Sequence, residues 1–283
     1  MLTITQYWKN SLKQKKPGKF IISKLLIRLK ISKYFTIKQE GYKLHFFPSA
    51  LSRLLWIDPT EPHTASIFFS DYFKHGDVVI DIGSNIGTVT IQSSVKVGKS
   101  GKIFSIEPNP KIYEFLLENL KFNNIKNVET FNIALGDSEG EINFSDKVSD
   151  VVNSIVKDGS GIKVRISTLD KLLKIDKTIN LLKIDVQGYD KFVLLGAKDI
   201  LKKTDCVHFP VINAHYENFG YTYKDIFEIF RDNGFRIYGF TKNKKIWMID
   251  EGYIPDDGDL LAIRNIDNFL LRTKYSLDNN KTF

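Results

Sequence analysis

The chain contains very little cysteine, no long apolar run and, over its first 39 residues, no acidic side chain. Cys206 is the single cysteine, so the 283 residues can form no internal disulfide and offer no thiolate cluster for zinc or iron–sulfur. No apolar stretch approaches the roughly 18–20 residues that a membrane-spanning helix needs. The most apolar early segment, residues 20–31, is broken by basic residues, whereas a secretory signal needs a continuous core of roughly 7–15 apolar residues. These absences predict a cytoplasmic protein.

The net charge of +8 is concentrated at the N-terminus. Ten lysines and arginines fall within residues 1–39, which leaves 31 basic against 33 acidic residues in the rest of the chain. The basic charge therefore belongs to an arm and not to the body. We expect this arm to attach the protein peripherally to an anionic membrane surface. Nucleic acid is the less favoured partner.

The chain divides into four expected segments. Residues 1–34 form the basic arm, with a helix over 20–34, and residues 35–75 form a hairpin (35–56) and a helix (61–73) with Thr60 as its cap. This second segment is expected to cover a cleft of the domain over 76–265, with Tyr42 and Trp56 as stacking surfaces for a sugar. Residues 266–283 are expected to be a C-terminal tail.

From Asp77 onward, short apolar strands alternate with helical stretches, which is typical of a parallel sheet wound with crossover helices. We expect strands over 78–82, 102–106, 128–135, 179–184 and 206–212, and helices over 87–97, 110–123, 189–203 and 223–234. Extra strands are expected over 141–144 and 163–166. The last strands, 235–240 and 260–264, have no long helix between them. The predicted fold is α/β, a Rossmann-like doubly wound sheet, mostly parallel with an antiparallel C-terminal strand.

The first motif with chemical content is a glycine turn, Gly83-Ser84-Asn85-Ile86-Gly87, directly after a buried strand. This is the usual ligand position in a wound sheet. A dinucleotide fingerprint would need glycine where Asn85 and Thr88 stand, so it fails. S-adenosylmethionine carries no phosphate and has a positive sulfonium, so Asp81 beside the turn favours that ligand.

Three further motifs follow later strands. Glu107, 24 residues after Gly83 and followed by Pro108-Asn109, ends the second strand and can accept hydrogen bonds from both hydroxyls of a ribose. Small residues Ala134-Leu135-Gly136 can line an adenine slot. Asp185 places a carboxylate at the edge of a central strand, with Gly188 permitting the next turn.

Together these stretches resemble the FkbM-type family of S-adenosylmethionine-dependent methyltransferases, most of which O-methylate hydroxyls of sugars and other natural products. The resemblance covers roughly residues 61–264 and rests on GDVVIDIGSNIGTVTI, SIEPNP, ALGDSEGEINF and LLKIDVQGYDKFVLLGA. It implies S-adenosyl-L-methionine as cofactor, held by Asp81, Gly83, Ser84, Asn85, Gly87, Glu107, Pro108, Asn109, Ala134, Leu135, Gly136 and Asp185. The chain departs from the family in having Gln187 where Glu is frequent, and in lacking an acid at the end of the strand over 206–212.

The expected reaction is methylation of a hydroxyl, with a sugar, glycan or glycolipid as the favoured acceptor. A general base is needed, and the candidates are Asp185, His215 and His208, in that order. No metal is expected; a metal-assisted route would use Asp185 with Asn213 and Asp190. Asp256-Asp257-Gly258-Asp259 is expected to be a polar turn. The alternatives are an RNA ribose 2′-O-methyltransferase and a non-catalytic module that only binds the cofactor.

Overall fold

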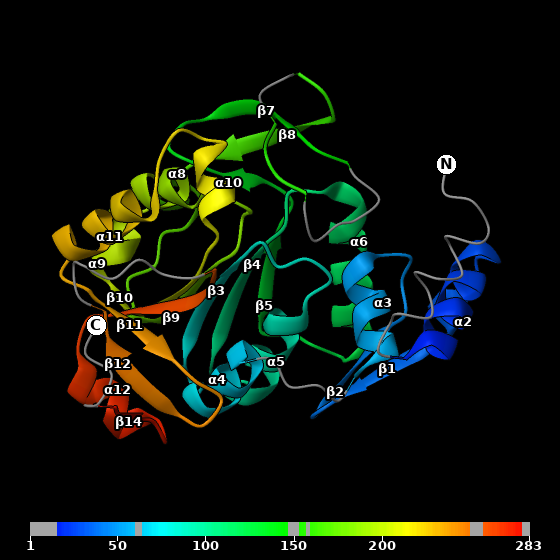
Figure 1. Cartoon of the computed structure of the whole chain (residues 1–283), viewed down its shortest axis with the longest axis horizontal. Coiled ribbons are helices and arrows are strands. Elements are labelled where there is room, and N and C mark those ends of the chain that lie inside the picture. The colour runs from blue at the N-terminus through cyan, green and yellow to red at the C-terminus, as the bar shows by residue number, and fades with distance from the viewer. Residues whose placement is uncertain (1–15, 60–63, 147–152, 157–158, 250–256, 279–283) are drawn as a thin grey trace.

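The computed structural model describes residues 16–59, 64–146, 153–156, 159–249 and 257–278. Nine strands form its central sheet: β3 (Val78–Ile82), β4 (Lys102–Ile106), β5 (Val128–Phe131), β9 (Ile179–Ile184), β10 (Thr204–Val211), β11 (Arg236–Phe240), β12 (Lys245–Met248), β13 (Gly258–Ile263) and β14 (Ser276–Leu277). Their order is β14-β12-β11-β13-β10-β9-β3-β4-β5 (Figure 1). Five neighbouring strands of this sheet, β10, β9, β3, β4 and β5, are mutually parallel. Strand β13 lies between β10 and β11 and is antiparallel to both. The predicted mostly parallel sheet with an antiparallel C-terminal strand is therefore confirmed.

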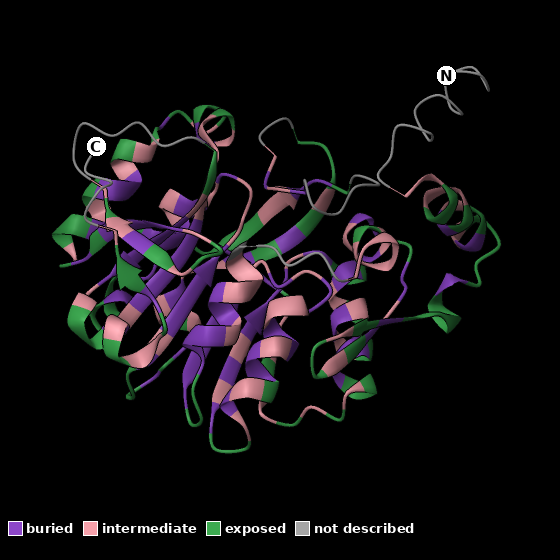
Figure 2. Cartoon of the chain, turned by 60° about the horizontal axis from the view of Figure 1, so that its bottom comes forward, coloured by how far each residue is buried: buried purple, intermediate pink, exposed green. Residues whose placement is uncertain are grey.

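Side-chain alternation along the central strands decides which helices cover each face of the sheet. Val79, Leu181 and Cys206 pack under α4 (Thr64–Tyr72), α5 (Thr88–Val97) and α12 (Ile266–Arg272). Their strand neighbours point the other way, onto α7 (Leu169–Leu172), α8 (Asp190–Leu195), α9 (Lys198–Lys202), α10 (Asn213–Glu217) and α11 (Tyr223–Asp232). Because both faces are covered, the central strands are buried along their length (Figure 2).

The N-terminal extension packs against the side of this core, on α6 (Pro110–Phe122). It consists of α2 (Pro17–Arg28), the short 3-10 helix η1 (Ser32–Tyr34), the hairpin of β1 (Thr36–Gln39) and β2 (Tyr42–His45), and α3 (Ala50–Ile57). The amide oxygens of Asn119 and Asn123 accept hydrogen bonds from the backbone of β2, both at 2.9 Å. The expected hairpin to Trp56 was wrong beyond His45: Ser49 caps α3 by accepting a hydrogen bond from the Ser52 N–H.

Two expected elements are divided in the structure. The strand over 128–135 ends at Phe131 because the Asn132 amide donates to the carbonyls of Glu107 and Pro108 and turns the chain. Residues 134–135 then form β6 (Ala134–Leu135) in a separate sheet with β7 (Gly140–Phe144) and β8 (Ile162–Ser167). The helix over 189–203 breaks at Gly196, which lies so close to the Gly136 carbonyl that a Cβ would stand 2.0 Å from its oxygen.

The remaining segments lie as follows. Residues 266–278, within the expected tail, contain α12 and β14, and Phe269 of α12 is buried against Phe68 of α4. The expected cap Thr60 and the start of its helix, residues 61–63, lie outside the described residues. No described helix is long and apolar enough to cross a membrane.

Candidate active site

A cavity of about 700 Å³ opens at the carboxyl ends of β3, β4, β9 and β10. This volume is ordinary for a small-molecule site, and the position is the one expected for a ligand in a wound sheet. The cavity has two halves, joined by Lys183, Asp185 and Gln187 on and after β9. The turn half is lined by Ile82, Gly83, Ser84, Asn85, Ile106, Glu107, Pro108, Asn109, Ile133, Ala134 and Leu135. The α4 half is lined by Lys38, Gln39, Glu40, Tyr42, Leu51, Leu55, Pro59, Ala65, Ser66, Phe69, Gln92, His208 and Asp259.

Gly83 sets the shape of the turn half. Its φ of +74° and its contact with β9 both require glycine, because a Cβ would stand 2.0 Å from the Asp185 carbonyl oxygen. The N–H groups of Gly83 and Ser84 both donate to the Ile106 carbonyl at 3.0 Å. The turn is thereby fixed to β4 on one side and to β9 on the other. Asn85 follows in a left-handed conformation at φ +49°, which asparagine tolerates.

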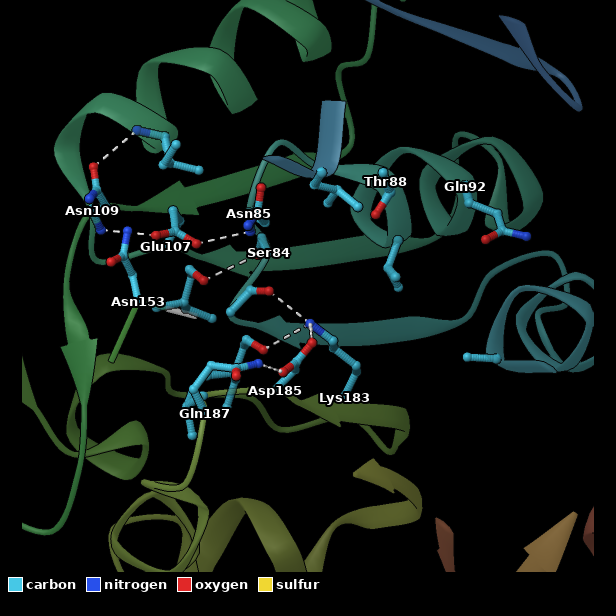
Figure 3. Close-up of a pocket in the computed structure, with 18 of the residues that line it drawn as sticks. Ser84, Asn85, Thr88, Gln92, Glu107, Asn109, Asn153, Lys183, Asp185 and Gln187 are labelled. Carbon is cyan, nitrogen blue, oxygen red and sulfur yellow. Dashed lines mark hydrogen bonds and ion pairs between the residues drawn. The ribbon is translucent and has the colours of Figure 1, made fainter. Parts of the chain in front are cut away.

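Glu107 forms the polar centre of the turn half (Figure 3). Its two carboxylate oxygens accept hydrogen bonds from the N–H groups of Asn85 and Asn109, each at 2.9 Å. The side chain is buried, and burial raises its pKa to about 7 although both N–H donors act to lower it. Each carboxylate oxygen has a further lone pair. The group can therefore accept hydrogen bonds from two neighbouring hydroxyls of a ligand.

A row of buried polar side chains crosses the sheet beneath the cavity. Strand register places Ser105, Asp81, Lys183 and His208 side by side on β4, β3, β9 and β10. The Asp81 carboxylate accepts from Thr90 at 2.6 Å and lies 3.2 Å from the Lys183 ammonium. The same ammonium donates to the Gly83 carbonyl at 2.7 Å and lies 3.8 Å from Asp185.

The Lys183 ammonium partly neutralises the two carboxylates at the junction of the halves. Burial acts to lower its pKa, but the carboxylates of Asp81 and Asp185 outweigh burial and raise the pKa above its ordinary value. One ammonium against two carboxylates leaves a net negative charge at the junction. The Asp185 oxygen also accepts a hydrogen bond from Gln187 at 2.9 Å, which a carboxylate at position 187 could not donate. This environment favours a positively charged ligand group.

His208 lies at the floor of the α4 half with two unpaired nitrogens. The ring is 4% exposed, and neither nitrogen has a hydrogen-bond partner among the described residues. Its Nε2 lies 3.7 Å from the carboxylate of Asp259 on β13. Phe69 packs against the ring with centroids 4.9 Å apart. His208 is therefore a buried polar ring without a hydrogen-bond partner in the described part of the chain, and its charged neighbour is the Asp259 carboxylate.

The structure brings most of the predicted site residues to the cavity, including Gly83, Asn85, Glu107, Asp185 and His208. Asp81 does not line the cavity: it is fully buried beneath it and acts on it through Lys183. Gly87 and Gly136 serve packing, because a Cβ at either position would come within 3 Å of Leu116 or Ile166.

His215, a predicted base, is not among the lining residues; its backbone packs against Gly188 after β9. Of the two expected stacking surfaces, Tyr42 lines the cavity, whereas Trp56 stacks on Phe46 with centroids 5.1 Å apart. Of the possible metal partners of Asp185, Asp190 is buried behind the turn, where it accepts from the Gly188 N–H at 3.2 Å.

Two charged side chains of the cavity, Lys183 and Asp259, are not among the site residues predicted from the sequence. Lys183 carries a signal that could have been used: a charged residue inside an otherwise apolar strand needs a buried partner. For Asp259 the sequence predicts a polar turn, but the residue belongs to β13 and lines the cavity. It supplies from the neighbouring strand the acid that β10 itself lacks. Phe144, Asn153 and Ile155, from the region of the smaller sheet, also line the cavity.

The fold and this cavity define a wound-sheet α/β domain with a small-molecule site at the carboxyl ends of its parallel strands. A profile of the family described as "Methyltransferase FkbM domain" matches residues 81–237. The chain belongs to this FkbM methyltransferase family, and its cofactor is S-adenosylmethionine.

Individual proteins match this chain only over short stretches or at low sequence identity. A probable cobalt-precorrin-6B C(15)-methyltransferase of Sulfolobus acidocaldarius is 31% identical over 55 residues, 19% of this chain and 29% of that protein. A protein-L-isoaspartate O-methyltransferase of Caenorhabditis elegans is 24% identical over 86 residues, 30% of this chain and 38% of that protein. The matches thus span well under half of these curated relatives. The crystal structure of the methyltransferase FkbM from Methylobacillus flagellatus aligns at a TM-score of 0.44 and 14% identity, over 68% of this chain and 44% of that one.

The turn half fits S-adenosylmethionine on its own chemistry. Glu107 can accept hydrogen bonds from two ribose hydroxyls, and Pro108, Ile133, Ala134 and Leu135 offer apolar surface for a base. The net negative junction around Lys183 suits a sulfonium or an ammonium. The residues present therefore match the ribose, adenine and methionine parts of the cofactor.

Proposed function

We propose that this chain transfers the methyl group of S-adenosylmethionine to a hydroxyl of a sugar-like acceptor, free or as part of a glycan or glycolipid. The observation that carries the proposal is His208, a buried imidazole with both nitrogens unpaired among the described residues, in the half of the cavity that the cofactor-binding groups leave open. Such a group is what hydroxyl methylation requires, because a neutral alcohol is a poor nucleophile until its proton is accepted.

The lining of the α4 half favours a neutral, hydroxyl-rich acceptor. It mixes hydrogen-bonding side chains such as Gln39, Ser66 and Gln92 with apolar surface from Leu51 and Leu55. Tyr42 adds an aromatic surface of the kind on which the apolar face of a sugar ring can rest. A sugar is recognised through hydrogen bonds to its hydroxyl groups and through contact of its C–H ring face with an apolar or aromatic surface, and this lining offers both.

The acidic residues that line the cavity disfavour a polyanionic acceptor such as RNA. Among the described lining residues, four are acidic (Glu40, Glu107, Asp185 and Asp259) and two are basic (Lys38 and Lys183). Lys183 is already paired with Asp81. A phosphate backbone is bound through many uncompensated basic groups, so this lining disfavours it.

The residues of the chain have separate parts in the proposed reaction. When bound, S-adenosylmethionine supplies a methyl group on a positive sulfur, which an oxygen can attack in line with the leaving sulfur. Glu107 and the Gly83 turn orient the cofactor, and the α4 half holds the acceptor hydroxyl against it, excluding water. His208 accepts the hydroxyl proton on a ring nitrogen, and Asp259, 3.7 Å from Nε2, stabilises the resulting imidazolium.

Methyl transfer from labelled cofactor into a cell extract, fractionated afterwards into glycan, lipid, RNA and protein, tests the proposal. We expect label in glycan or glycolipid, and a loss of about 10²–10⁴-fold in His208→Gln without a change in cofactor affinity. His75→Gln, an exposed histidine outside the cavity, is the matched control. Label in RNA would contradict the acceptor. Cofactor binding with no label in any fraction would favour a non-catalytic module.

A further inference from the structure

The face of α2 that points away from the core is apolar, which is unusual for a surface helix. Ile22, Leu25 and Leu29 are 49%, 54% and 56% exposed, and their spacing of three and four residues places them on one side of the helix. On the neighbouring flank of the helix, about 100° around its axis, Ser23 and Leu26 are buried, and Leu26 packs in the cluster of the hairpin and α6. Figure 1 places α2 at the edge of the molecule, beyond α3. One flank of this helix is therefore buried against the protein, whereas the neighbouring apolar flank of Ile22, Leu25 and Leu29 is about half exposed.

Two exposed aromatic residues follow the helix in the sequence. Tyr34 and Phe35 are 76% and 40% exposed in the segment between α2 and β1. We call the set Ile22, Leu25, Leu29, Tyr34 and Phe35 the α2 patch. In Figure 2 this end of the chain is largely coloured as exposed. Several exposed apolar side chains within one short segment are typical of an interaction surface.

The charge around the α2 patch has one sign. Seven basic residues and no acidic residue lie between positions 16 and 39: Lys16, Lys19, Lys24, Arg28, Lys30, Lys33 and Lys38. Lys16 is paired with Asp58, and Lys24 and Lys33 lie over the rings of Phe20 and Tyr34. Arg28 and Lys30 flank Leu29 in the sequence and are exposed. Apolar side chains interleaved with cations match a surface that presents anionic headgroups above hydrocarbon.

We propose that the α2 patch docks the protein on an anionic lipid bilayer, with Ile22, Leu25 and Leu29 entering the boundary between headgroups and acyl chains. Nucleic acid would satisfy the cations but would leave these three side chains without an apolar partner. This is a docking surface and not an active site, so it stands independently of the proposed reaction.

The α2 patch is close in the sequence to residues at the rim of the cavity. Phe35 lies three residues before Lys38, about 10 Å along the chain. Lys38 and Glu40 are exposed and line the α4 half, so they lie at its opening. Docking through the α2 patch therefore holds the acceptor side of the cavity close to the membrane surface, where a lipid-borne glycan would be presented.

Cosedimentation of the full chain with vesicles tests the proposal without any measurement of activity. We expect binding to vesicles of phosphatidylglycerol and phosphatidylcholine, and much weaker binding to phosphatidylcholine alone. Leu25→Asp puts a carboxylate at the centre of the patch and should weaken binding by on the order of tenfold or more. Leu271→Asp is the matched control, because it makes the same change at an 86%-exposed leucine on α12, far from the patch.

Circular dichroism of both variants checks that each remains folded. The proposal is overturned if the wild type fails to sediment with anionic vesicles, or if the two variants bind them equally. It is also overturned if phosphatidylcholine alone binds as well. A further arm uses a structureless RNA oligonucleotide. Binding to RNA that is tighter than binding to the vesicles, and is unchanged in Leu25→Asp, would assign the basic residues to nucleic acid.

Discussion

The two halves of the cavity are built in different ways. The turn half comes from consecutive strand–turn units of one sheet, and its central carboxylate, Glu107, is held by backbone N–H groups of its own motif (Asn109) and of the preceding motif (Asn85). The α4 half comes from the N-terminal hairpin, α3, α4, α5, β10 and β13, which are distant in sequence. The residues of the turn half are therefore encoded locally, whereas the residues proposed to hold the acceptor come together only when the whole chain has folded.

The halves also differ in how their polar groups are satisfied. In the turn half the Glu107 carboxylate is hydrogen-bonded before any ligand arrives, which pre-organises it. In the α4 half the His208 ring nitrogens lack partners among the described residues. An unpaired buried polar atom costs free energy, and the acceptor can recover that cost by supplying the missing hydrogen bond. Substitutions in the two halves should therefore have different effects.

The largest effect is expected at Lys183, which serves both halves. Lys183→Met should lower the free energy of unfolding by about 3–5 kcal/mol, because it leaves the buried Asp81 carboxylate without its ammonium partner. Chemical denaturation measures the loss. The double variant Asp81→Asn/Lys183→Met removes both charges and should recover a large part of it. If the double variant is as unstable as the single, the ion pair is not the cause.

The next effect isolates the geometry of the turn half. Gly83→Ala should cost about 3 kcal/mol of stability and abolish measurable cofactor binding, since the new Cβ would collide with the Asp185 carbonyl at 2.0 Å. Gly220→Ala is the control: its φ of +78° is equally unfavourable for alanine, but no atom lies within 4 Å. We expect it to cost about 1 kcal/mol. Equal losses in the two variants would show that backbone conformation, not the contact between turns, limits this site.

A substitution of Glu107 should change the affinity for the cofactor and leave the turnover rate nearly unchanged. Glu107→Gln should weaken binding of S-adenosylhomocysteine about 100-fold by calorimetry, because charge-assisted hydrogen bonds to the ribose are lost. The turnover rate at saturating cofactor should change little. An effect on turnover with unchanged affinity would place Glu107 in the chemistry instead.

The affinity for the cofactor should decrease as the pH is lowered through the pKa of Glu107. The pKa of Glu107 is raised to about 7 by burial, against the two N–H donors, and the ionised form is the one that accepts hydrogen bonds from hydroxyls. Affinity should therefore be full above about pH 7 and fall roughly tenfold for each pH unit below it. The Glu107→Gln variant has no carboxylate at this position and should lack this dependence.

Sequence reasoning succeeded where structure is local. The bounds of β3, β4 and β9 were predicted to the residue, because buried parallel strands are apolar runs that end at a turn. The same motifs predicted Gly83, Glu107 and Asp185, all of which line the cavity. The family assignment rested on these motifs and is confirmed by the match over residues 81–237.

Sequence reasoning failed where contacts are made between distant segments. The pairing of Asp81 with Lys183 depends on the parallel register of β3 and β9. The approach of Asp259 to His208 depends on an antiparallel register that sets Asp259 opposite Pro210. Neither register can be read from a single strand, so Asp259 was taken for a turn residue. The division at Asn132 was missed for the same reason, since its side chain bonds to the loop after another strand.

The smallest expected effect tests whether that long-range register matters for catalysis. Asp259→Asn keeps the size of the side chain but removes the charge 3.7 Å from His208, and it should lower the turnover rate about tenfold with unchanged cofactor affinity. Asp257→Asn, two residues earlier on the same approach to β13 and outside the cavity, should have no such effect. If the two variants behave alike, Asp259 does not support the imidazole. The α4 half would then act through His208 alone, and the proposed acceptor chemistry would rest on the single strand β10, whereas the turn half draws on several strands.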